Sequence, residues 1–249
     1  MPFTVSHIAA VLPLRRHCSM DVFAALAIGS MMPDMHYFLP VLREHWPLPS
    51  HHLISLPLFC LPAGWLLWRL WRPLWMPVST VDGHEPPVPA PWRVMIALIV
   101  GALTHLAWDA CTHANYGLGL YLPALGQPLF RVDHAAISAA NLLQYGSSVA
   151  GLLALVMAAW PARQRFVHGI REGVAVSWLV AALFAVAILT ALLTFALTWN
   201  MGENVNQLRH TLRLTAWNGL SMPLLIVMLY PLIWRLRQRK AIHTSDQLP

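Results

Sequence analysis

Long apolar stretches separated by short polar ones are the dominant pattern along this chain of 249 residues. A helix needs about 20 mostly apolar residues to cross a hydrocarbon layer of about 30 Å. Five stretches reach or approach that length, and the fourth contains no charged residue. They are 53–71, 93–109, 143–160, 174–199 and 212–234. The pattern predicts an all-α, polytopic helical membrane protein of about five spans, with residues 1–249 forming a single membrane-embedded domain.

The N-terminal segment 1–50 follows a different pattern. In 20–32 only about a dozen apolar residues precede Pro33, a length typical of a buried, re-entrant or interfacial helix rather than of a span. We therefore expect a short helix at one membrane face, and a sixth span if the segment does cross. Polar and Pro-rich residues at 76–91 predict a loop. The mixed stretch 114–142 predicts a second loop, long enough to cover a site.

Composition supports a membrane location. Hydrophobic residues make up 57% of the chain and charged residues 10%, whereas soluble domains carry roughly 25% charged residues. Too few polar side chains are present to cover a water-facing surface. The net charge of +6 comes from dispersed basic residues with no basic face, so we expect no nucleic-acid partner. Three widely spaced cysteines form no CxxC pair, which supports neither a disulfide framework nor a thiolate zinc site.

The distribution of Lys and Arg predicts an orientation. With five spans and the basic tail 235–249 in the cytoplasm, ten basic residues lie inside and six outside, which favours an outer N-terminus. The predicted location is the bacterial cytoplasmic membrane. If 20–32 does cross, Arg15 and Arg16 move inside and the count changes in favour of six spans.

The clearest chemical pattern is GALTHLAWDACTH, where His105, Asp109 and His113 follow one another at intervals of four, with Thr104 and Thr112 beside them. Residues four apart share one helix face, so the three side chains point towards one place. Imidazole nitrogens and carboxylate oxygens are ligands for zinc and similar divalent metals. The pattern also fits a His and an Asp at a helix end that hydrogen-bond to each other and to the backbone.

Further ionisable residues flank the apolar stretches. His7 lies near the N-terminus, Asp34 follows Pro33, and His51 and His52 begin the first predicted span. In the five-span arrangement the start of the first span and the end of the second meet at the outer face, and the N-terminal residues join them if 20–32 does not cross. Singly, each fits an interfacial His or a helix cap. Together they predict a metal site near the outer face.

Four motifs, in this order, resemble an uncharacterised bacterial membrane protein family, the domain of unknown function 4184. The motifs are MPFTVSHIAAVLPLRR, IGSMMPDMHYFLP, SHHLISLPLFCLPAG and GALTHLAWDACTH. The resemblance is close over 1–115, continues weakly through LQYGSSVAG, and implies a multi-spanning membrane protein. That family is distantly similar to membrane-bound metal-dependent hydrolases and zinc-dependent phospholipase C proteins. The ligands that this implies are His7, Asp34, His51, His105 and Asp109, and His113 matches the Thr-His that closes the family's motif. We expect His52, Thr104, Thr112 and His113 to support these ligands.

The leading hypothesis is a metal-dependent hydrolase acting on a membrane lipid or a lipid-linked phosphate ester. Zinc would activate a water molecule, and Asp34 would act as a ligand or as a general base. One alternative is a non-enzymatic membrane protein in which a structural His/Asp cluster holds the N-terminal segment to the helix ends. Another is a metal or proton transporter, although the stretch 174–197 offers only three hydroxyl side chains to line a path.

Overall fold

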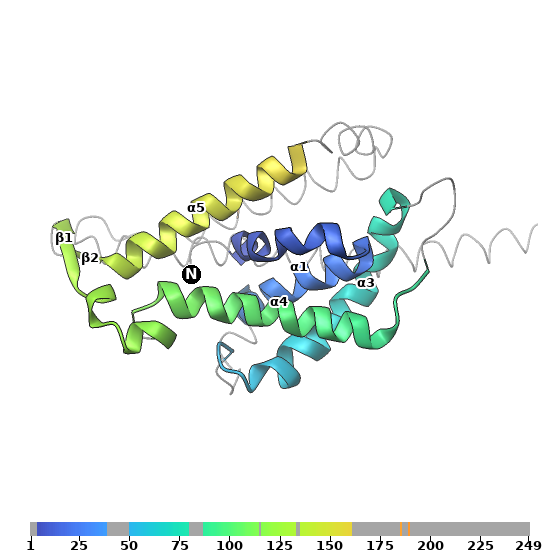
Figure 1. The fold of residues 1–249 in the computed structure, drawn as a ribbon, viewed down its shortest axis with the longest axis horizontal. Coiled ribbons are helices and arrows are strands. Elements are labelled where there is room, and N and C mark those ends of the chain that lie inside the picture. Colours follow the sequence, from blue (N-terminus) through green and yellow to red (C-terminus); the bar gives the residue numbers. More distant parts are fainter. Residues whose placement is uncertain are drawn as a thin grey trace, which may run out of the picture.

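A computed structural model gives the arrangement of the first two thirds of the chain. The described residues are 4–38, 50–79, 87–114, 116–132, 135–160, 185 and 189. Helices dominate this part, as the apolar pattern predicts, and several of them run side by side (Figure 1). The predicted spans 174–199 (but for two positions) and 212–234, and the basic tail 235–249, lie outside the described residues.

The N-terminal region forms a helical hairpin. A 3₁₀ helix, η1 (Thr4–His17), leads into the α-helix α1 (Met20–Phe38). The predicted short helix at 20–32 is therefore longer than expected, because α1 continues through Pro33. Proline lacks an N–H and its ring crowds the carbonyl four residues earlier. Here the following turn is held in place by burial, since Asp34 and Met35 are both buried.

The next helix returns along α1. A π-helical turn, η2 (Leu56–Cys60), leads into α3 (Leu61–Ser79), which extends beyond the predicted span 53–71 and into the stretch predicted to be a loop from 76. The Trp68 indole donates to the Asp21 carbonyl at 2.9 Å, and Arg72 binds the Asp21 carboxylate at 3.1 Å. These contacts fix the middle of α3 against the beginning of α1.

Helix α4 (Pro91–Thr112) contains the predicted span 93–109 and runs parallel to α1. The two backbones approach closely: a Cβ atom at Gly101 would lie 2.2 Å from the Leu26 carbonyl oxygen, and one at Gly29 would lie 2.2 Å from that of Leu98. Only glycine permits such an approach. The apolar core lies among α1, α3 and α4 and includes Leu26, Met32, Trp68, Leu98 and Leu106.

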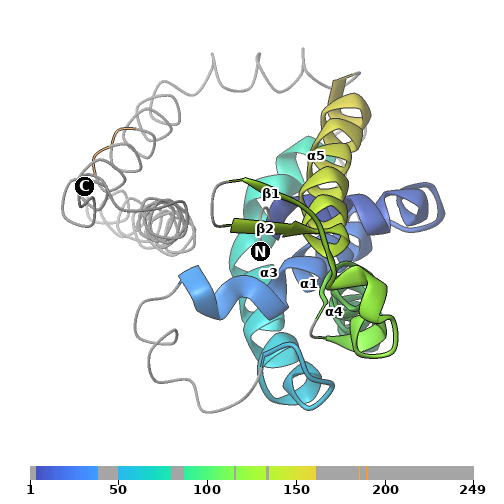
Figure 2. The same ribbon diagram turned by 90° about the vertical axis from the view of Figure 1, so that its left-hand side faces the viewer.

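A compact connection and a fourth α-helix complete the described part. The connection contains η3 (Gly117–Leu120), η4 (Pro123–Leu125), β1 (Pro128–Val132) and β2 (Ala135–Ser138). The two strands pair antiparallel, a small departure from the predicted all-α fold (Figure 2).

Helix α5 (Ala139–Ala159) directly follows the β1–β2 hairpin and contains most of the predicted span 143–160. It begins at a capping box in which Ser138 and Asn141 bond reciprocally. It runs antiparallel to α4, and the Trp108 indole donates to Ser147 Oγ at 3.0 Å. The close contact between Gly151 and the Ser6 carbonyl places η1 beside the same helix.

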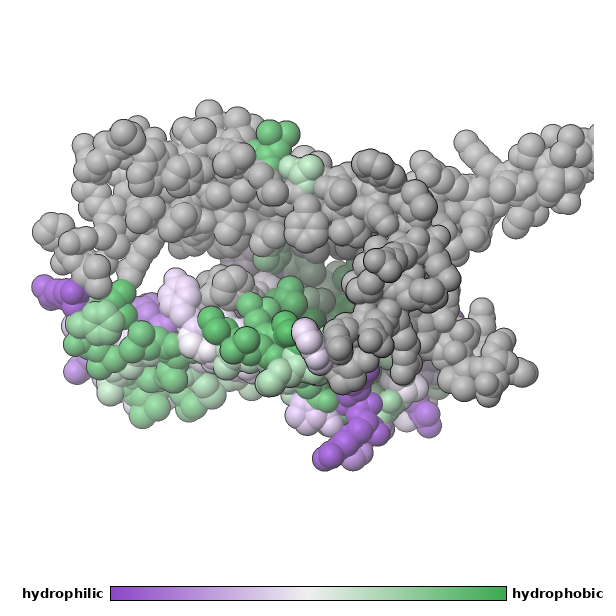
Figure 3. Space-filling model, turned by 90° about the horizontal axis from the view of Figure 1, so that it is seen from above, coloured by the Kyte–Doolittle hydropathy of each residue, from purple (hydrophilic) through white to green (hydrophobic). Residues whose placement is uncertain are grey.

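Two helices in the described part are long and apolar enough to cross a membrane by length and composition. One begins at Pro91 and contains α4, and the other is α5. Of the most apolar 18 residues in each, 44% are buried within the structure in the first and 11% in α5. Figure 3 shows hydrophobic residues over much of the described surface on one face, with hydrophilic residues gathered in separate groups.

Candidate metal centre

Three separate segments bring the candidate ligands together. Asp34 lies in the last turns of α1, His51 lies in the turn before η2, and His105 and Asp109 lie one turn apart on α4. Because α1 and α4 run parallel and nearly touch at Gly101, their C-terminal halves present these side chains to the same place. The spacing of four on α4 therefore places His105 and Asp109 on one helix face, as the sequence pattern predicts.

Four donor atoms form a tight group in which nitrogen and oxygen alternate. His51 Nε2 lies 3.1 Å from Asp34 Oδ1 and 3.2 Å from Asp109 Oδ2. His105 Nε2 lies 3.3 Å from each of the same two oxygens. One donor atom from each of the four residues lies within 4.8 Å of the others. Ligands about 2.0–2.1 Å from a tetrahedral zinc ion are about 3.3–3.4 Å apart, so the group could hold a metal ion.

The burial of this group makes a bound cation chemically sensible. Within the described part of the chain, His105 Nε2 and Asp109 Oδ2 are buried without a hydrogen-bond partner. They lie 3.3 Å apart but are not aligned for a hydrogen bond. Leaving a buried polar atom unpaired costs about 1–3 kcal/mol. A cation among the four donors would satisfy both atoms.

The orientation of His105 is set by a backbone carbonyl. His105 Nδ1 lies 2.7 Å from the Ser30 carbonyl oxygen, which can only accept a hydrogen bond. Nδ1 therefore carries the proton, and in the neutral ring the Nε2 lone pair faces the two carboxylates. A metal-binding histidine usually donates its other ring N–H in this manner.

A chain of hydrogen bonds sets His51 in the same way. His36 Nδ1 lies 3.0 Å from the Pro33 carbonyl oxygen, so in the neutral ring His36 Nε2 is an acceptor. The Ser50 hydroxyl, 3.4 Å from that nitrogen, can donate to it, and Ser50 Oγ then accepts from His51 Nδ1 at 2.9 Å. In the neutral ring this order leaves the His51 Nε2 lone pair directed at the carboxylates, and in the protonated ring Nε2 donates to Asp34 Oδ1 at 3.1 Å.

The turn that carries His51 is fixed further by Tyr116, whose hydroxyl donates to the His51 carbonyl. Burial by itself lowers the pKa of His51, but the neighbouring carboxylates of Asp109 and Asp34 favour the protonated ring and raise that pKa above the ordinary value. Burial raises the pKa of the Tyr116 hydroxyl, and the charge of Asp109 adds to the effect. The two carboxylates thus make this place favourable for positive charge.

The carboxylate oxygens that lie outside the four-donor group, Asp34 Oδ2 and Asp109 Oδ1, also have neighbours. Asp34 Oδ2 accepts a hydrogen bond from Thr4 Oγ1 at 2.7 Å. Asp109 Oδ1 lies 3.8 Å from His7 Nε2 and 3.6 Å from His113 Nδ1. Oδ1 of Asp34 thus belongs to the donor group, and its Oδ2 is bonded to Thr4.

His7 lies beside the four donors but is not one of them. Its ring stacks on His105, with the centroids 3.8 Å apart and the planes at 19°. The ring is buried, and among the described residues His7 Nδ1 has no hydrogen-bond partner. His7 therefore packs against His105 and lies outside the group that could hold a metal ion.

The four supporting residues have different surroundings. Thr104 and Thr112 donate to the carbonyls of Gly101 and Trp108 in their own helix, at 2.7 and 3.1 Å. His113 Nδ1 contacts the Asp109 carbonyl at 3.1 Å. The Gln144 amide lies 2.7 Å from the other ring nitrogen of His113, which links α5 to the site. His52 is exposed.

A cleft of about 270 Å³ gives access to the group. Its lining consists of Tyr37, Ser50, His51, His52, Asp109, His113 and Tyr116. The sequence patterns did not indicate the two tyrosines. Tyr37 lies three residues after Asp34 on the same helix face, a signal that becomes visible only once α1 is known to continue past Pro33.

The fold and this site define a helical protein with a His/Asp group that could hold a metal ion. The chain belongs to the family described as Domain of unknown function (DUF4184), whose sequence model matches residues 1–232. This confirms the family drawn from the four motifs and extends the match over the later stretches. No curated protein and no solved structure matches the chain.

Proposed function

We propose that this protein is a metal-dependent hydrolase of the bacterial cytoplasmic membrane, acting on a lipid or a lipid-linked phosphate ester. One observation carries the proposal. Four donors from three segments converge within 4.8 Å, and two of the converging atoms, His105 Nε2 and Asp109 Oδ2, are buried without another described partner. His51 and Asp34 are hydrogen-bonded to each other, and a cation would supply the partner that the other two atoms lack.

The donor set favours zinc among the common divalent metals, because two imidazoles and two carboxylates provide the borderline ligands that zinc accepts. Two neutral histidines and two carboxylates also balance the charge of a divalent ion in a buried place. A zinc ion held by these four residues would lower the pKa of a bound water towards about 7 and would polarise a phosphoryl oxygen. The chain's own residues hold the ligands in orientation through the Ser30 carbonyl, Ser50 and Thr4.

The cleft supplies the groups that would orient a substrate. Tyr37, Tyr116, His52 and His113 line its wall. The exposed His52 can donate a hydrogen bond to an oxygen of a phosphate ester, whereas Tyr116 already donates its O–H to the His51 carbonyl.

The membrane part of the proposal rests on α4 and α5, whose apolar lengths suffice for spans. We propose a multi-pass protein with a cytoplasmic C-terminus and the metal centre near the outer face. A substrate that resides in the bilayer could then reach the cleft by lateral diffusion.

A non-enzymatic role has its own support in the N-terminal contacts. The hydrogen bond from Thr4 to Asp34 and the stacking of His7 on His105 tie the first residues to the helix ends. The cluster is confined to the C-terminal ends of α1 and α4. It therefore fits a hydrolase or a structural role better than a transporter, which would need polar residues along a path through the membrane.

Elemental analysis of the purified protein in detergent tests the proposal. We expect about one zinc or other divalent ion per chain, lost in the His105→Ala, Asp109→Ala double variant. The matched control is His52→Ala, which removes an exposed histidine and should retain the ion. No metal in the wild-type protein, even after reloading, would overturn the metal centre. Bound metal without hydrolysis of phospholipids or phosphate esters would favour the structural role.

A further inference from the structure

The N-terminal hairpin runs between two chemically different ends of the structure. Thr4, at the start of η1, bonds to Asp34 beside the candidate metal centre. From there η1 leads away to His17, and α1 returns to Asp34. The turn at residues 18–19 therefore lies at the far end, away from the metal centre.

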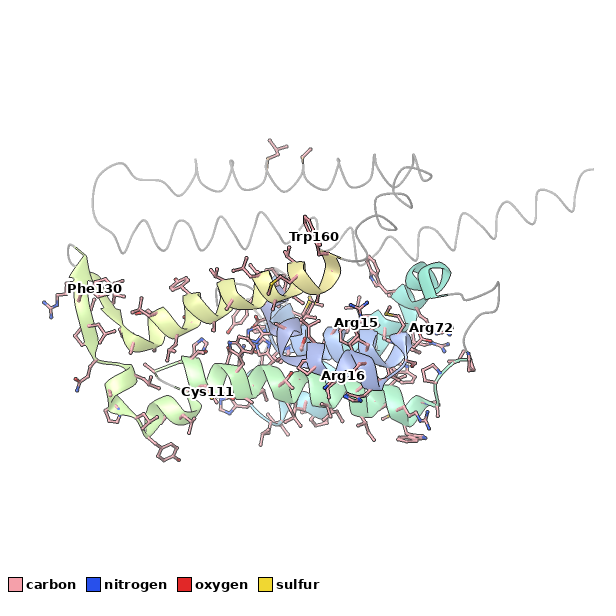
Figure 4. The ribbon with its side chains drawn as sticks, turned by 45° about the horizontal axis from the view of Figure 1, so that its top comes forward. Arg15, Arg16, Arg72, Cys111, Phe130 and Trp160 are labelled. Carbon is pink, nitrogen blue, oxygen red and sulfur yellow. The ribbon has the colours of Figure 1, made fainter. Side chains whose placement is uncertain are left out.

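Arginines gather at that far end. Arg72 on α3 pairs with Asp21 at the start of α1, and Arg15 lies 3.5 Å from the Ala158 carbonyl at the end of α5. A cavity of about 390 Å³ joins Asp21 to Arg93 at the start of α4. Figure 4 shows Arg15, Arg16 and Arg72 in one half of the structure, with Cys111 and Phe130 in the other. We call the four residues Arg15, Arg16, Arg72 and Arg93 the arginine end.

The distance between the two ends matches a bilayer. With a rise of about 2.0 Å per residue, the 14 residues of η1 extend about 28 Å. At about 1.5 Å per residue, the 19 residues of α1 extend the same distance. The hydrocarbon layer is about 30 Å thick. Each arm of the hairpin is thus long enough to cross.

The surface between the two ends is apolar, and aromatic residues flank it. Exposed aliphatic side chains cover the outer sides of α4 and α5, among them Ile96, Leu103, Val149, Leu153 and Met157. At the arginine end, Trp92 is 58% and Trp160 59% exposed, and towards the other end Tyr145 is 57% exposed. Tryptophan and tyrosine favour the two membrane–water interfaces.

We infer that residues 4–38 cross the bilayer twice, with the arginine end in the anionic headgroup layer of the cytoplasmic leaflet and the candidate metal centre near the opposite face. The inference rests on the proposed membrane location and replaces the predicted short interfacial helix with two crossings. It adds two spans to the five predicted from the apolar stretches. The N-terminus then lies outside and the C-terminus inside.

The distribution of positive charge becomes more asymmetric in this arrangement. Moving Arg15 and Arg16 inside changes ten against six basic residues into twelve against four. The twelve inside are Arg15, Arg16, Arg69, Arg72, Arg93, Arg163, Arg165, Arg171, Arg235, Arg237, Arg239 and Lys240, and the four outside are Arg43, Arg131, Arg209 and Arg213. An excess of Lys and Arg in cytoplasmic segments is the main determinant of orientation. Anionic lipids of that leaflet attract such residues further.

Cysteine labelling tests the inference. Among the native cysteines, Cys111 is exposed at the metal-centre end, Cys60 is buried, and Cys18 is partly buried at the hairpin turn. One full-length variant keeps only Cys111. A second lacks all three native cysteines and carries His17→Cys, at an exposed position beside the turn. Both are exposed to a membrane-impermeant maleimide in spheroplasts and in inside-out vesicles.

We expect Cys111 to react in spheroplasts only, and the His17→Cys thiol to react in inside-out vesicles only. Reaction of the His17→Cys thiol in spheroplasts would show that the hairpin does not cross, and reversal of both results would overturn the orientation. Membrane fractionation before labelling tests the proposed membrane location separately. A chain absent from the membrane fraction would refute that location, whereas a chain in the membrane fraction with an unexpected labelling pattern would refute only the two crossings or the orientation. Metal content of both variants, measured in parallel, shows that each has kept the fold.

Discussion

Helices α4 and α5 have similar length and similar hydropathy but very different surroundings. They contain 22 and 21 residues, and their most apolar windows have mean hydropathies of 1.8 and 1.6. The window of α4 is 44% buried within the described structure and that of α5 is 11% buried. Helix α4 carries two of the four donors, whereas α5 contributes a single amide beside His113. Hydropathy thus indicates that both could be spans, and the polar residues on the buried face distinguish their roles.

The largest expected effect is on stability, at a glycine where α4 packs tightly against α1. Gly101→Ala on α4 would place a Cβ atom 2.2 Å from the Leu26 carbonyl oxygen, so α1 and α4 must separate. We expect a loss of about 3 kcal/mol or more in the free energy of unfolding. Gly146→Ala on α5 is the matched control, because no atom lies within 4 Å of its Cβ position, and it should stabilise by about 0.5–1 kcal/mol. Denaturant unfolding in detergent measures both, and equal stabilities would contradict the close packing of α4.

The second prediction concerns metal affinity. Asp109→Asn keeps the size of the side chain but removes the charge and one acceptor of the donor group. We expect affinity to fall by more than the roughly 10–100-fold typical of residues that only support ligands. Ser148→Ala on α5 is the control, because its hydroxyl bonds to Gln144 in its own helix. Isothermal titration of the metal-free protein with Zn²⁺ measures both, and equal affinities would remove Asp109 from the site.

A smaller loss of metal affinity is expected when the contact between the N-terminal segment and Asp34 is removed. Thr4→Val removes the hydrogen bond to Asp34 Oδ2 with little change of shape. Loss of a group that orients a ligand should weaken metal binding about tenfold. Thr4→Ser, which keeps the hydroxyl, should restore most of the affinity in the same titration. An unchanged affinity in Thr4→Val would show that η1 does not support the site.

The smallest effect concerns the contact between the two helices. Trp108→Phe removes the hydrogen bond to Ser147 Oγ and should cost about 1 kcal/mol of stability. Ser147→Ala removes the same bond from the side of α5. A double-mutant cycle isolates the interaction between the two residues. Additive losses would show that the bond contributes nothing, and metal affinity should remain unchanged throughout.

Much of the candidate site could be predicted because its residues obey short-range geometry. The spacing of His105 and Asp109 needs only the helical repeat, and both residues belong to the four-donor group. The positions of Asp34 and His51 relative to the apolar stretches predict that they lie near this pair, and both belong to the group. The predicted ranges of α4 and α5 overlap the observed helices for the same reason.

Other features depend on tertiary contacts that no local pattern encodes. The continuation of α1 past Pro33 follows from burial against α4, which overrides the local preference of proline. The Ser30 carbonyl that orients His105 belongs to the backbone and leaves no side-chain signal. The position of His7 beside the donors, rather than among them, depends on where η1 packs.

The assembly of the donor group from distant segments has a consequence for the lifetime of the protein. Ser30 and His105, which meet across α1 and α4, are 75 residues apart in the chain. The group can therefore form only after these segments have packed, so a cation that binds it selects the assembled chain. At a free concentration one hundred times its Kd, such a ligand stabilises the folded state by about 2.7 kcal/mol. Metal supply would then set how much of the newly made protein escapes proteolytic quality control.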